Sequence, residues 1–527
     1  MKAKYIYTLL LGFIALMTVS CEDRLDIAQN GNLGGMEDYY QTDDEALAAS
    51  ASMYASWRSA FYNWWFLKNL LADDVWCGGG ARGDNTEMEA INEYTFGTDN
   101  GFIEDVYSSL YTIIYKANLI IDNMSDDTDV KARAIAEAKF FRGWAHFELV
   151  TLYGTAPVVN HLLSSSEYRQ ANSTAEALWA QVESDFSDAI SANALPSKSS
   201  ASDTETGIRV TKEVAKAYLG KAYLFQGKYT DAATTLDEVI NTGLYSLYDG
   251  DYDQLLHAST NNCCEAMLEC QMRNDAENIW NFFSMWCIMQ GWRSSNMSYS
   301  TEAQSYLATG TYGFMNPRED LYEAFVEMEG ADGYRLNQTM RTYEQMEEVG
   351  VSLMEGYSLI DNEGYFMWKN RALLADCVYN FSAFQVLQYV NYRVMRYAEV
   401  LLLAAEAHVQ GGGSTDKALE YINTIRTRAQ LSSLTSVTLD DVKKEKRLEL
   451  CLESVRFQDL VRWGDAETAL ASQGKEIPSL QNDATSGIQV TITNTNTTYG
   501  FKTKHNLLPI PLKELEVNPN MSQNEGW

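Results

Sequence analysis

Four tryptophans in this chain lie in polar, glycine- and asparagine-rich stretches rather than on a periodic apolar stripe. They are Trp76, Trp280, Trp286 and Trp292. Flat aromatic rings stack on the apolar faces of sugars, while arginine, asparagine and aspartate side chains hydrogen-bond to hydroxyl groups. These residue types therefore predict a polar-lined aromatic binding site. The alternative is that the rings fill seams between loops and a scaffold, so the cluster carries more weight than any single ring.

Recognisable catalytic motifs are missing from the sequence. It contains no H-E-x-x-H zinc motif, no G-x-S-x-G nucleophile motif and no P-loop. The aspartates within 249–253 are spaced as in a calcium loop, but Gln254 and Thr260 occupy the positions that such a loop reserves for glycine and glutamate. No pair of carboxylates stands out among the 72 acidic residues as a glycosidase site. We therefore expect a binding protein without a metal or a cofactor.

The charge balance restricts the partners of the chain. Its 527 residues carry a formal net charge of −32, and 46% of them are hydrophobic. Such an acidic body disfavours nucleic acid and anionic membrane surfaces as partners. The apolar content is sufficient for a large packed core.

The N-terminus has the form of an export signal. Lys2 and Lys4 precede an apolar run over 6–19, and small residues then lead to Cys21. This pattern resembles a bacterial lipobox, which predicts removal of residues 1–20 and a lipid anchor on Cys21. The acidic residues directly after Cys21 resemble tags that send such lipoproteins to the outer face of the outer membrane.

The other cysteines do not form a recognisable disulfide framework. Seven remain if Cys21 carries lipid, and their spacing is irregular. Most are expected to be buried thiols. A bridge involving Cys263, Cys264 or Cys270 stays open at this point.

Helix hairpins of the tetratricopeptide type are expected to form the scaffold that positions the tryptophans. Over 211–243, Leu219-Gly220, Tyr223 and Ala232 fall where that pattern requires a Leu-Gly pair, an aromatic residue and a small residue. A second copy follows at 396–429. A single hairpin cannot bury its apolar stripe, so neighbouring hairpins must stack on one another.

The remaining segments are assigned from weaker periodicity. A helix is expected to begin at Asp43, the stretch 64–105 reads as aromatic-rich loop, and 488–493 alternates as a strand does. We expect a tether over 21–42 followed by one domain over 43–527. The predicted scaffold comprises 43–243 and 393–463. The predicted ligand-face insertion is 244–392, and the predicted C-terminal wrap is 464–527.

Several long motifs, in order, resemble the SusD/RagB family of outer-membrane nutrient-binding lipoproteins. They include AEAKFFRGWAHFELVTLYGTAPVV, RYAEVLLLAAEAHVQGG, KEKRLELCLESVRFQDLVRWG and the ending LLPIP…NPNMSQNEGW. The resemblance implies an all-α domain with a tetratricopeptide-like scaffold, long loops, short helices and a few small strands. It also implies a non-enzymatic, cell-surface protein that binds a glycan and acts as a lid on a SusC-like TonB-dependent β-barrel transporter.

The resemblance transfers a ligand site by region, to 76–100 and 280–312. The candidate ligand-binding residues are Trp76, Arg82, Asp74, Asn100, Trp280, Trp286, Trp292, Arg293 and Tyr299. The main alternative keeps the lid role but replaces the glycan with a peptide or another nutrient, which neighbouring genes for peptidases would indicate. A surface hydrolase or a purely scaffolding protein are further alternatives.

Overall fold

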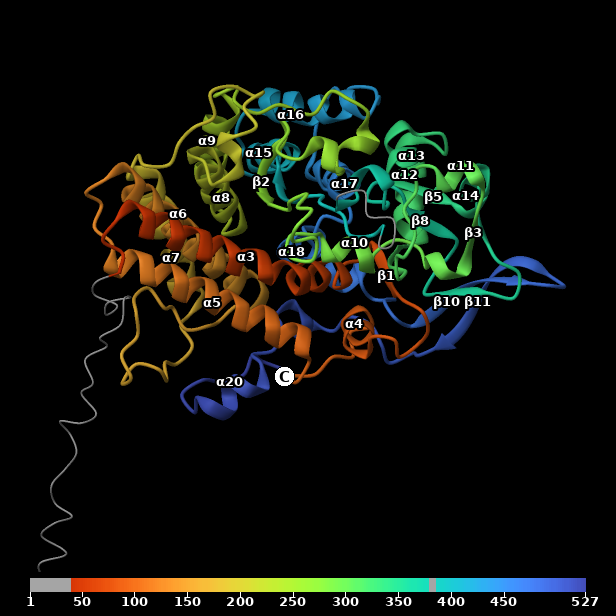
Figure 1. The fold of residues 1–527 in the computed structure, drawn as a ribbon, viewed down its shortest axis with the longest axis horizontal. Coiled ribbons are helices and arrows are strands. Elements are labelled where there is room, and N and C mark those ends of the chain that lie inside the picture. The colour runs from red at the N-terminus through yellow and green to blue at the C-terminus, as the bar shows by residue number, and fades with distance from the viewer. Residues whose placement is uncertain (1–38, 379–384) are drawn as a thin grey trace, which may run out of the picture.

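The computed structural model describes residues 39–378 and 385–527, and the chain is mostly helical (Figure 1). Ten helices of this part form the scaffold. They are α3 (Asp43–Leu70), α5 (Gly101–Asn123), α6 (Asp129–Tyr153), α7 (Ala175–Ser191), α8 (Lys212–Phe225), α9 (Tyr229–Ile240), α15 (Tyr397–Gln410), α16 (Thr415–Arg428), α17 (Leu439–Leu450) and α18 (Arg456–Trp463). The predicted all-α fold class with small inserted strands is confirmed.

Helix α3 begins as predicted but continues further than expected. The Thr42 hydroxyl and the Glu45 carboxylate form a capping box at its start, and acidic residues in the first turn suit the helix dipole. The expected loop over 64–105 is wrong in three places: α3 continues to Leu70 and buries Trp64 and Trp65, α4 spans Thr86–Asn92, and α5 begins at Gly101. Trp64 packs against Trp144 of α6, and Trp65 packs against Trp286 and Tyr392. This tertiary burial outweighs the modest helix propensity of tryptophan.

The two predicted hairpins form and lie side by side. Helices α8 and α9 make the first, α15 and α16 make the second, and α9 packs against α15. Gly220 explains the close approach within the first hairpin, because a Cβ atom there would lie 2.6 Å from Leu236 Cγ. The Leu-Gly pair of the motif therefore marks the contact between the two helices.

A buried ionic network joins the second hairpin to α17 and to the strand before it. Arg396 is fully buried and donates hydrogen bonds to Glu453, Glu449 and Glu265, at 2.7 Å for the nearest Glu453 contact. Burial alone would raise the pKa of Glu449, but Arg428, Arg396 and other cations lower it to about 2. Charges at this depth need such partners, so the network fixes α17 against the hairpin.

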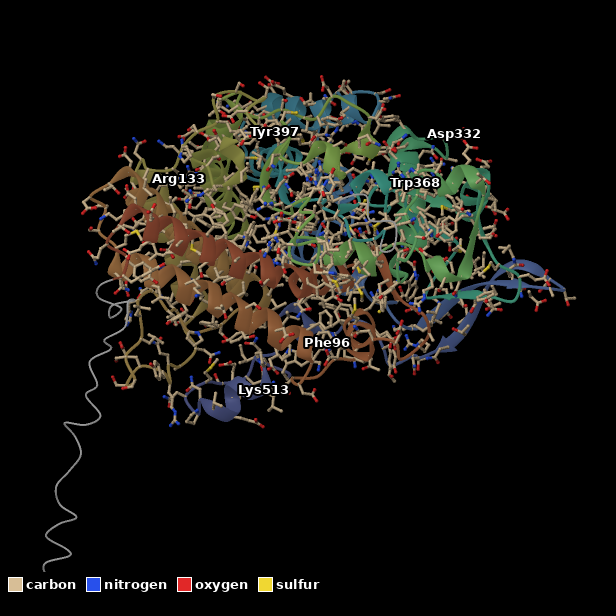
Figure 2. All side chains as sticks on the ribbon, viewed as in Figure 1. Phe96, Arg133, Asp332, Trp368, Tyr397 and Lys513 are labelled. Atoms are coloured by element: carbon tan, nitrogen blue, oxygen red, sulfur yellow. The ribbon has the colours of Figure 1, made fainter. Side chains whose placement is uncertain are left out.

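The segment between the hairpins forms small sheets and short helices. Three antiparallel two-stranded pairs are β2 (Ala266–Cys270) with β9 (Tyr392–Arg396), β3 (Met297–Tyr299) with β6 (Val351–Leu353), and β5 (Met340–Thr342) with β8 (Tyr365–Met367). A fourth pair joins β4 (Phe314–Pro317) to β1 (Val75–Gly78). The helices are α10 (Met285–Met289), α11 (Thr301–Gln304), α12 (Glu319–Glu329), α13 (Tyr334–Thr339) and α14 (Tyr343–Glu348). Figure 2 shows Trp368 among these elements.

The C-terminal part of the chain pairs with a strand of the insertion and also lies beside the helical scaffold (Figure 1). The predicted strand over 488–493 is confirmed as part of β11 (Gly487–Thr495), which pairs with β10 (Glu476–Asp483), and β10 also pairs with β7 (Ser358–Ile360). Short helices α19 (Ala466–Ala469) and α20 (Leu512–Val517) flank this hairpin in sequence. Helix α20 lies below α5 in Figure 1.

Candidate ligand-binding site

Three of the four tryptophans are buried, and two of these, Trp286 and Trp292, pack against other aromatic rings. Trp286 on α10 is 6% exposed, and its ring lies 5.8 Å from that of Trp65 and 5.9 Å from that of Tyr392. Trp292 is 4% exposed, and its ring stacks on Trp368 at an interplanar angle of 17°. In this structure both rings have the seam-filling role that the sequence left as the alternative.

Tyr299 supports Trp292 rather than facing solvent directly. The Trp292 indole N–H donates a 2.8 Å hydrogen bond to the Tyr299 hydroxyl. Burial raises the pKa of Tyr299, so this phenol stays neutral and accepts that bond across the physiological range. This hydrogen bond fixes Trp292 to the end of β3, which carries Tyr299.

Trp76 lines a cleft but offers little of its ring. It lies on β1, is 3% exposed, and has the Arg318 guanidinium 4.3 Å above its ring. The cleft has a volume of about 490 Å³ and separates Trp76 from Ile492 and Thr495 of β11. Its direct role in stacking stays a prediction.

Asp74 and Asn100 use their polar atoms within the scaffold. Asp74 is buried and accepts a 3.0 Å hydrogen bond from Arg447. The Asn100 side chain caps α5 by accepting from the backbone N–H groups of Phe102 and Ile103. Both side chains are buried, so neither belongs to a solvent-facing binding surface in this structure.

Arg82 is positioned by a group of carboxylates. Its side chain is 33% exposed, and its guanidinium pairs with Glu93, lies 3.5 Å from Glu89 and lies 3.9 Å from Asp361. Burial raises the pKa of Asp361 to about 7, although Arg82 opposes the shift. Arg82 therefore ties the loop after β1 to Glu89 and Glu93 in the segment that follows it.

Arg293 brings the two predicted regions together. Its guanidinium donates to the Tyr312 carbonyl at 3.1 Å, lies 5.7 Å from the centre of the Tyr312 ring, and lies 3.8 Å from the Asp84 carboxylate. Tyr312 is 47% exposed. A solvent-facing aromatic ring, a guanidinium and a carboxylate thus meet at one place on the surface.

Glycines allow the two loops to approach closely. Gly79, with φ of 110°, donates to the Gly313 carbonyl at 2.9 Å, and a Cβ atom on Gly80 would lie 3.0 Å from Arg293 Cζ. Residues 78–83 also match G-x-G-x-x-G, but β1 pairs antiparallel with β4, which is not the parallel setting of a dinucleotide site. These glycines therefore allow the loop after β1 to contact Gly313 and Arg293, and they do not form a dinucleotide-binding motif.

Trp280 is the exposed member of the four tryptophans. It is 56% exposed, and its ring meets that of Phe283 edge-on at 6.2 Å. Phe283 packs on a small cluster that contains Ile288, and the Ile288 carbonyl accepts a 2.8 Å hydrogen bond from the Tyr312 N–H. A continuous set of contacts therefore links Trp280 to Tyr312.

We refer to the surface formed by Asp84, Arg293 and Tyr312 as the Tyr312 face. Arg82 lies on the same loop as Asp84, and Trp280 is linked to Tyr312 only through Phe283 and Ile288. Sequence reasoning did not select Tyr312 or Asp84. Tyr312 lies beside Gly310 and Gly313, a turn-rich context that could have indicated an exposed ring. Asp84 gave no comparable signal, because its role depends on a contact with a residue more than 200 positions away.

Other functional classes find little support in the described part of the chain. Within residues 39–378 and 385–527, no group of three or more His, Cys, Asp or Glu side chains is arranged to hold a metal ion. No helix in these ranges has the length and apolarity needed to span a membrane. The seven cysteines in these ranges form no disulfide with one another, so a bridge of Cys263, Cys264 or Cys270 with another of them is not present.

Comparison with known proteins agrees with this architecture. Residues 276–527 match a model described as "SusD family", and residues 35–224 match one described as "Starch-binding associating with outer membrane". The chain belongs to the SusD/RagB family. Members of this family are non-catalytic binding proteins, which confirms the prediction that the chain is not an enzyme.

Individual SusD-like proteins are similar over nearly the whole chain. SusD-like protein P2 of Formosa agariphila is 26% identical over 515 residues, covering 93% of this chain and 94% of that protein. A solved structure titled "Laminarin binding SusD-like protein" is 29% identical with a TM-score of 0.77, covering 93% and 100% of the two chains. Surface glycan-binding protein A from Bacteroides thetaiotaomicron, solved in complex with laminarihexaose, is 22% identical with a TM-score of 0.72 and coverage of 92% and 99%.

Proposed function

We propose that this SusD-like protein captures a glycan at the cell surface and delivers it to a SusC-like TonB-dependent outer-membrane transporter, on which it acts as a lid. The observation that carries the glycan part is the Tyr312 face, where an exposed ring lies beside Arg293 and Asp84. The ring supplies an apolar platform, and the charged groups supply hydrogen bonds to hydroxyls.

A carbohydrate fits this surface better than a peptide does. The 29% identical relative is named for binding laminarin, which supports a glucan as the first ligand to test. The Tyr312 face combines an exposed ring with a guanidinium and a carboxylate, which can stack on a sugar and hydrogen-bond its hydroxyls.

The membrane and transporter parts of the proposal rest on family membership. Cys21, the predicted lipid attachment site, lies outside the described residues, as does the predicted signal peptide over 1–20. The family model over 35–224 is described as associating with the outer membrane. We propose that lipid on Cys21 anchors the chain there, facing the cell exterior.

A titration of the mature protein tests the glycan part. The protein with Cys21→Ser is titrated with laminarihexaose, maltohexaose, cellohexaose and xylohexaose, and heat is recorded by calorimetry. We expect saturable binding of at least one hexasaccharide. The affinity should lie in the micromolar to millimolar range, because a small number of contacts provides only a modest binding free energy. Absence of heat with all four, together with binding of a tryptic peptide mixture, would favour the peptide alternative.

A further inference from the structure

A second aromatic surface lies on α5, and it shares no residue with the Tyr312 face. Tyr107, Tyr111 and Tyr115 are spaced four residues apart, so they form one stripe with a rise of about 6 Å per step. Two adjoining cavities of about 380 and 310 Å³ lie over this stripe. We call this surface the α5 groove; its lining includes Tyr107, Tyr111, Tyr115, Tyr168, Gln170 and Asn518.

The rings of the groove differ in exposure along its length. Tyr107 is buried, Tyr111 is half-buried, and Tyr115 is 53% exposed. Tyr168, from the loop after α6, is 68% exposed and lines both cavities. The groove therefore has two exposed rings, Tyr115 and Tyr168, beside the more buried rings of Tyr107 and Tyr111.

The loop that carries Tyr168 is fixed from the scaffold side. The Leu162 backbone N–H donates to the Asp122 carboxylate at 2.7 Å. Glu167 accepts from the Ser164 backbone N–H at 2.8 Å and lies 3.1 Å from the His161 ring nitrogen Nε2. These bonds reduce the conformational entropy that binding would otherwise cost.

The C-terminal segment after α20 fixes the other end of the same loop. The Asn518 side chain donates to the Gln170 carbonyl at 2.7 Å, and the Asn520 side chain donates to the Arg169 carbonyl at 2.6 Å. Figure 1 shows α20 below α5, and Figure 2 labels Lys513 on that helix. The groove thus has a helix as its floor and two tied segments as its walls.

We infer that the α5 groove is a second carbohydrate-binding site, which takes a neutral stretch of the polysaccharide whose other part occupies the Tyr312 face. Exposed tyrosine rings offer stacking surfaces, and amide and hydroxyl groups beside them suit sugar hydroxyls. The inference rests on the proposed function, because it assumes that the ligand is a glycan.

The shape of the groove favours a sugar chain over a protein partner. Cavities of 300 to 400 Å³ are of the size that holds part of a small ligand, whereas a stable protein interface needs a far larger and flatter patch. The lining is mixed: apolar residues such as Val159 and Leu163 lie beside the polar Gln170 and Asn518 and the Glu514 carboxylate, a combination that suits a neutral sugar. A protein interface is the competing outcome of the test.

Two weak sites on one protein raise its affinity for a ligand that is long enough to reach both sites. A polymer that occupies both sites binds the second at a high effective concentration, so its overall affinity exceeds that of a short oligosaccharide without a stronger contact. A hexasaccharide that occupies one site gains nothing from the other. The polymer therefore reports on the two sites together, and the hexasaccharide reports on each site alone.

The test uses the double variant Tyr115→Ala/Tyr168→Ala of the mature protein, with Tyr357→Ala as control. Both groove rings are exposed, so the variant should fold, and Tyr357 is a 46% exposed tyrosine outside both surfaces. Retardation in native gels containing laminarin or starch measures polymer binding, and calorimetry with laminarihexaose and maltohexaose measures the affinity of each single site. We expect polymer binding to weaken about tenfold, while the hexasaccharide affinity of the Tyr312 face and both properties of the control stay unchanged.

Other results would overturn the inference in distinguishable ways. Polymer binding equal to wild type in the groove variant, or no retardation of the wild type by either polymer, contradicts a second glycan site. If the hexasaccharide still binds in those cases, the proposed function stands and only the groove fails. Loss of a transporter complex in the groove variant, with unchanged polymer binding, would assign the groove to a protein interface instead.

Discussion

The individual tryptophans show how far residue type predicts role. Trp286 and Trp292 have the same polar sequence context as Trp280, yet they are 6% and 4% exposed while Trp280 is 56% exposed. The difference comes from contacts with Trp65, Trp368 and other distant rings. A local context of asparagine and glycine indicates a loop, but it does not tell which side of the loop faces solvent.

Trp292 offers a prediction that separates packing from binding. Trp292→Ala should lower the free energy of unfolding by about 3–5 kcal/mol, because it leaves a cavity against Trp368. Trp292→Phe keeps a ring and removes the donor to Tyr299, so it should cost about 1 kcal/mol. Urea unfolding measures both. Unchanged stability of the alanine variant, together with lost glycan binding, would restore Trp292 as a direct ligand contact.

At the scale of elements, the helix hairpins were predictable and the loops were not. Periodicity and the Leu-Gly pair located α8, α9, α15 and α16, because 219–220 carries the packing information within the motif itself. The end of α3 and the contact between Arg293 and Asp84 depend on residues far away in sequence. Non-local packing therefore decides the features that sequence reasoning missed.

The ionic network around α17 gives an element-scale prediction. Glu449→Gln should lower the free energy of unfolding by about 3–5 kcal/mol, because Arg396, Arg335 and Arg428 lose a buried anionic partner. The control is Glu327→Gln, whose carboxylate pairs with Lys444 in solvent and should cost below about 1 kcal/mol. Chemical denaturation at pH 7 measures the two differences.

The same variant has a pH dependence with a defined sign. The pKa of Glu449 is about 2 in the folded protein, below its ordinary value of 4.5. Its contribution to stability is therefore present above pH 4.5 and is lost as the pH falls toward 2. The stability gap between wild type and Glu449→Gln should narrow over that range. A gap that widens on acidification would contradict the assignment of Glu449 as a buried, ionised partner.

At the scale of the whole molecule, the fold separates support from recognition. The stacked hairpins and the network around Arg396 form a rigid frame, and two surfaces with open aromatic rings lie apart on that frame. The family, the fold class and the absence of catalysis could be predicted from sequence motifs. The two regions that meet at the Tyr312 face were predicted, but the contact of Arg293 with Asp84 and the α5 groove were not, because each joins segments that are distant in the chain.

The central claim is that the Tyr312 face holds a glycan, and one titration tests it most directly. Tyr312→Ala/Arg293→Ala and the control Tyr357→Ala are compared with wild type by calorimetry, using laminarihexaose and maltohexaose. We expect the double variant to lose about tenfold or more in affinity for the hexasaccharide that the wild type binds, since a stacking surface and a charged hydrogen-bond donor are both removed. The control should bind as wild type does. A double variant that is folded and binds the hexasaccharide with wild-type affinity would contradict the claim.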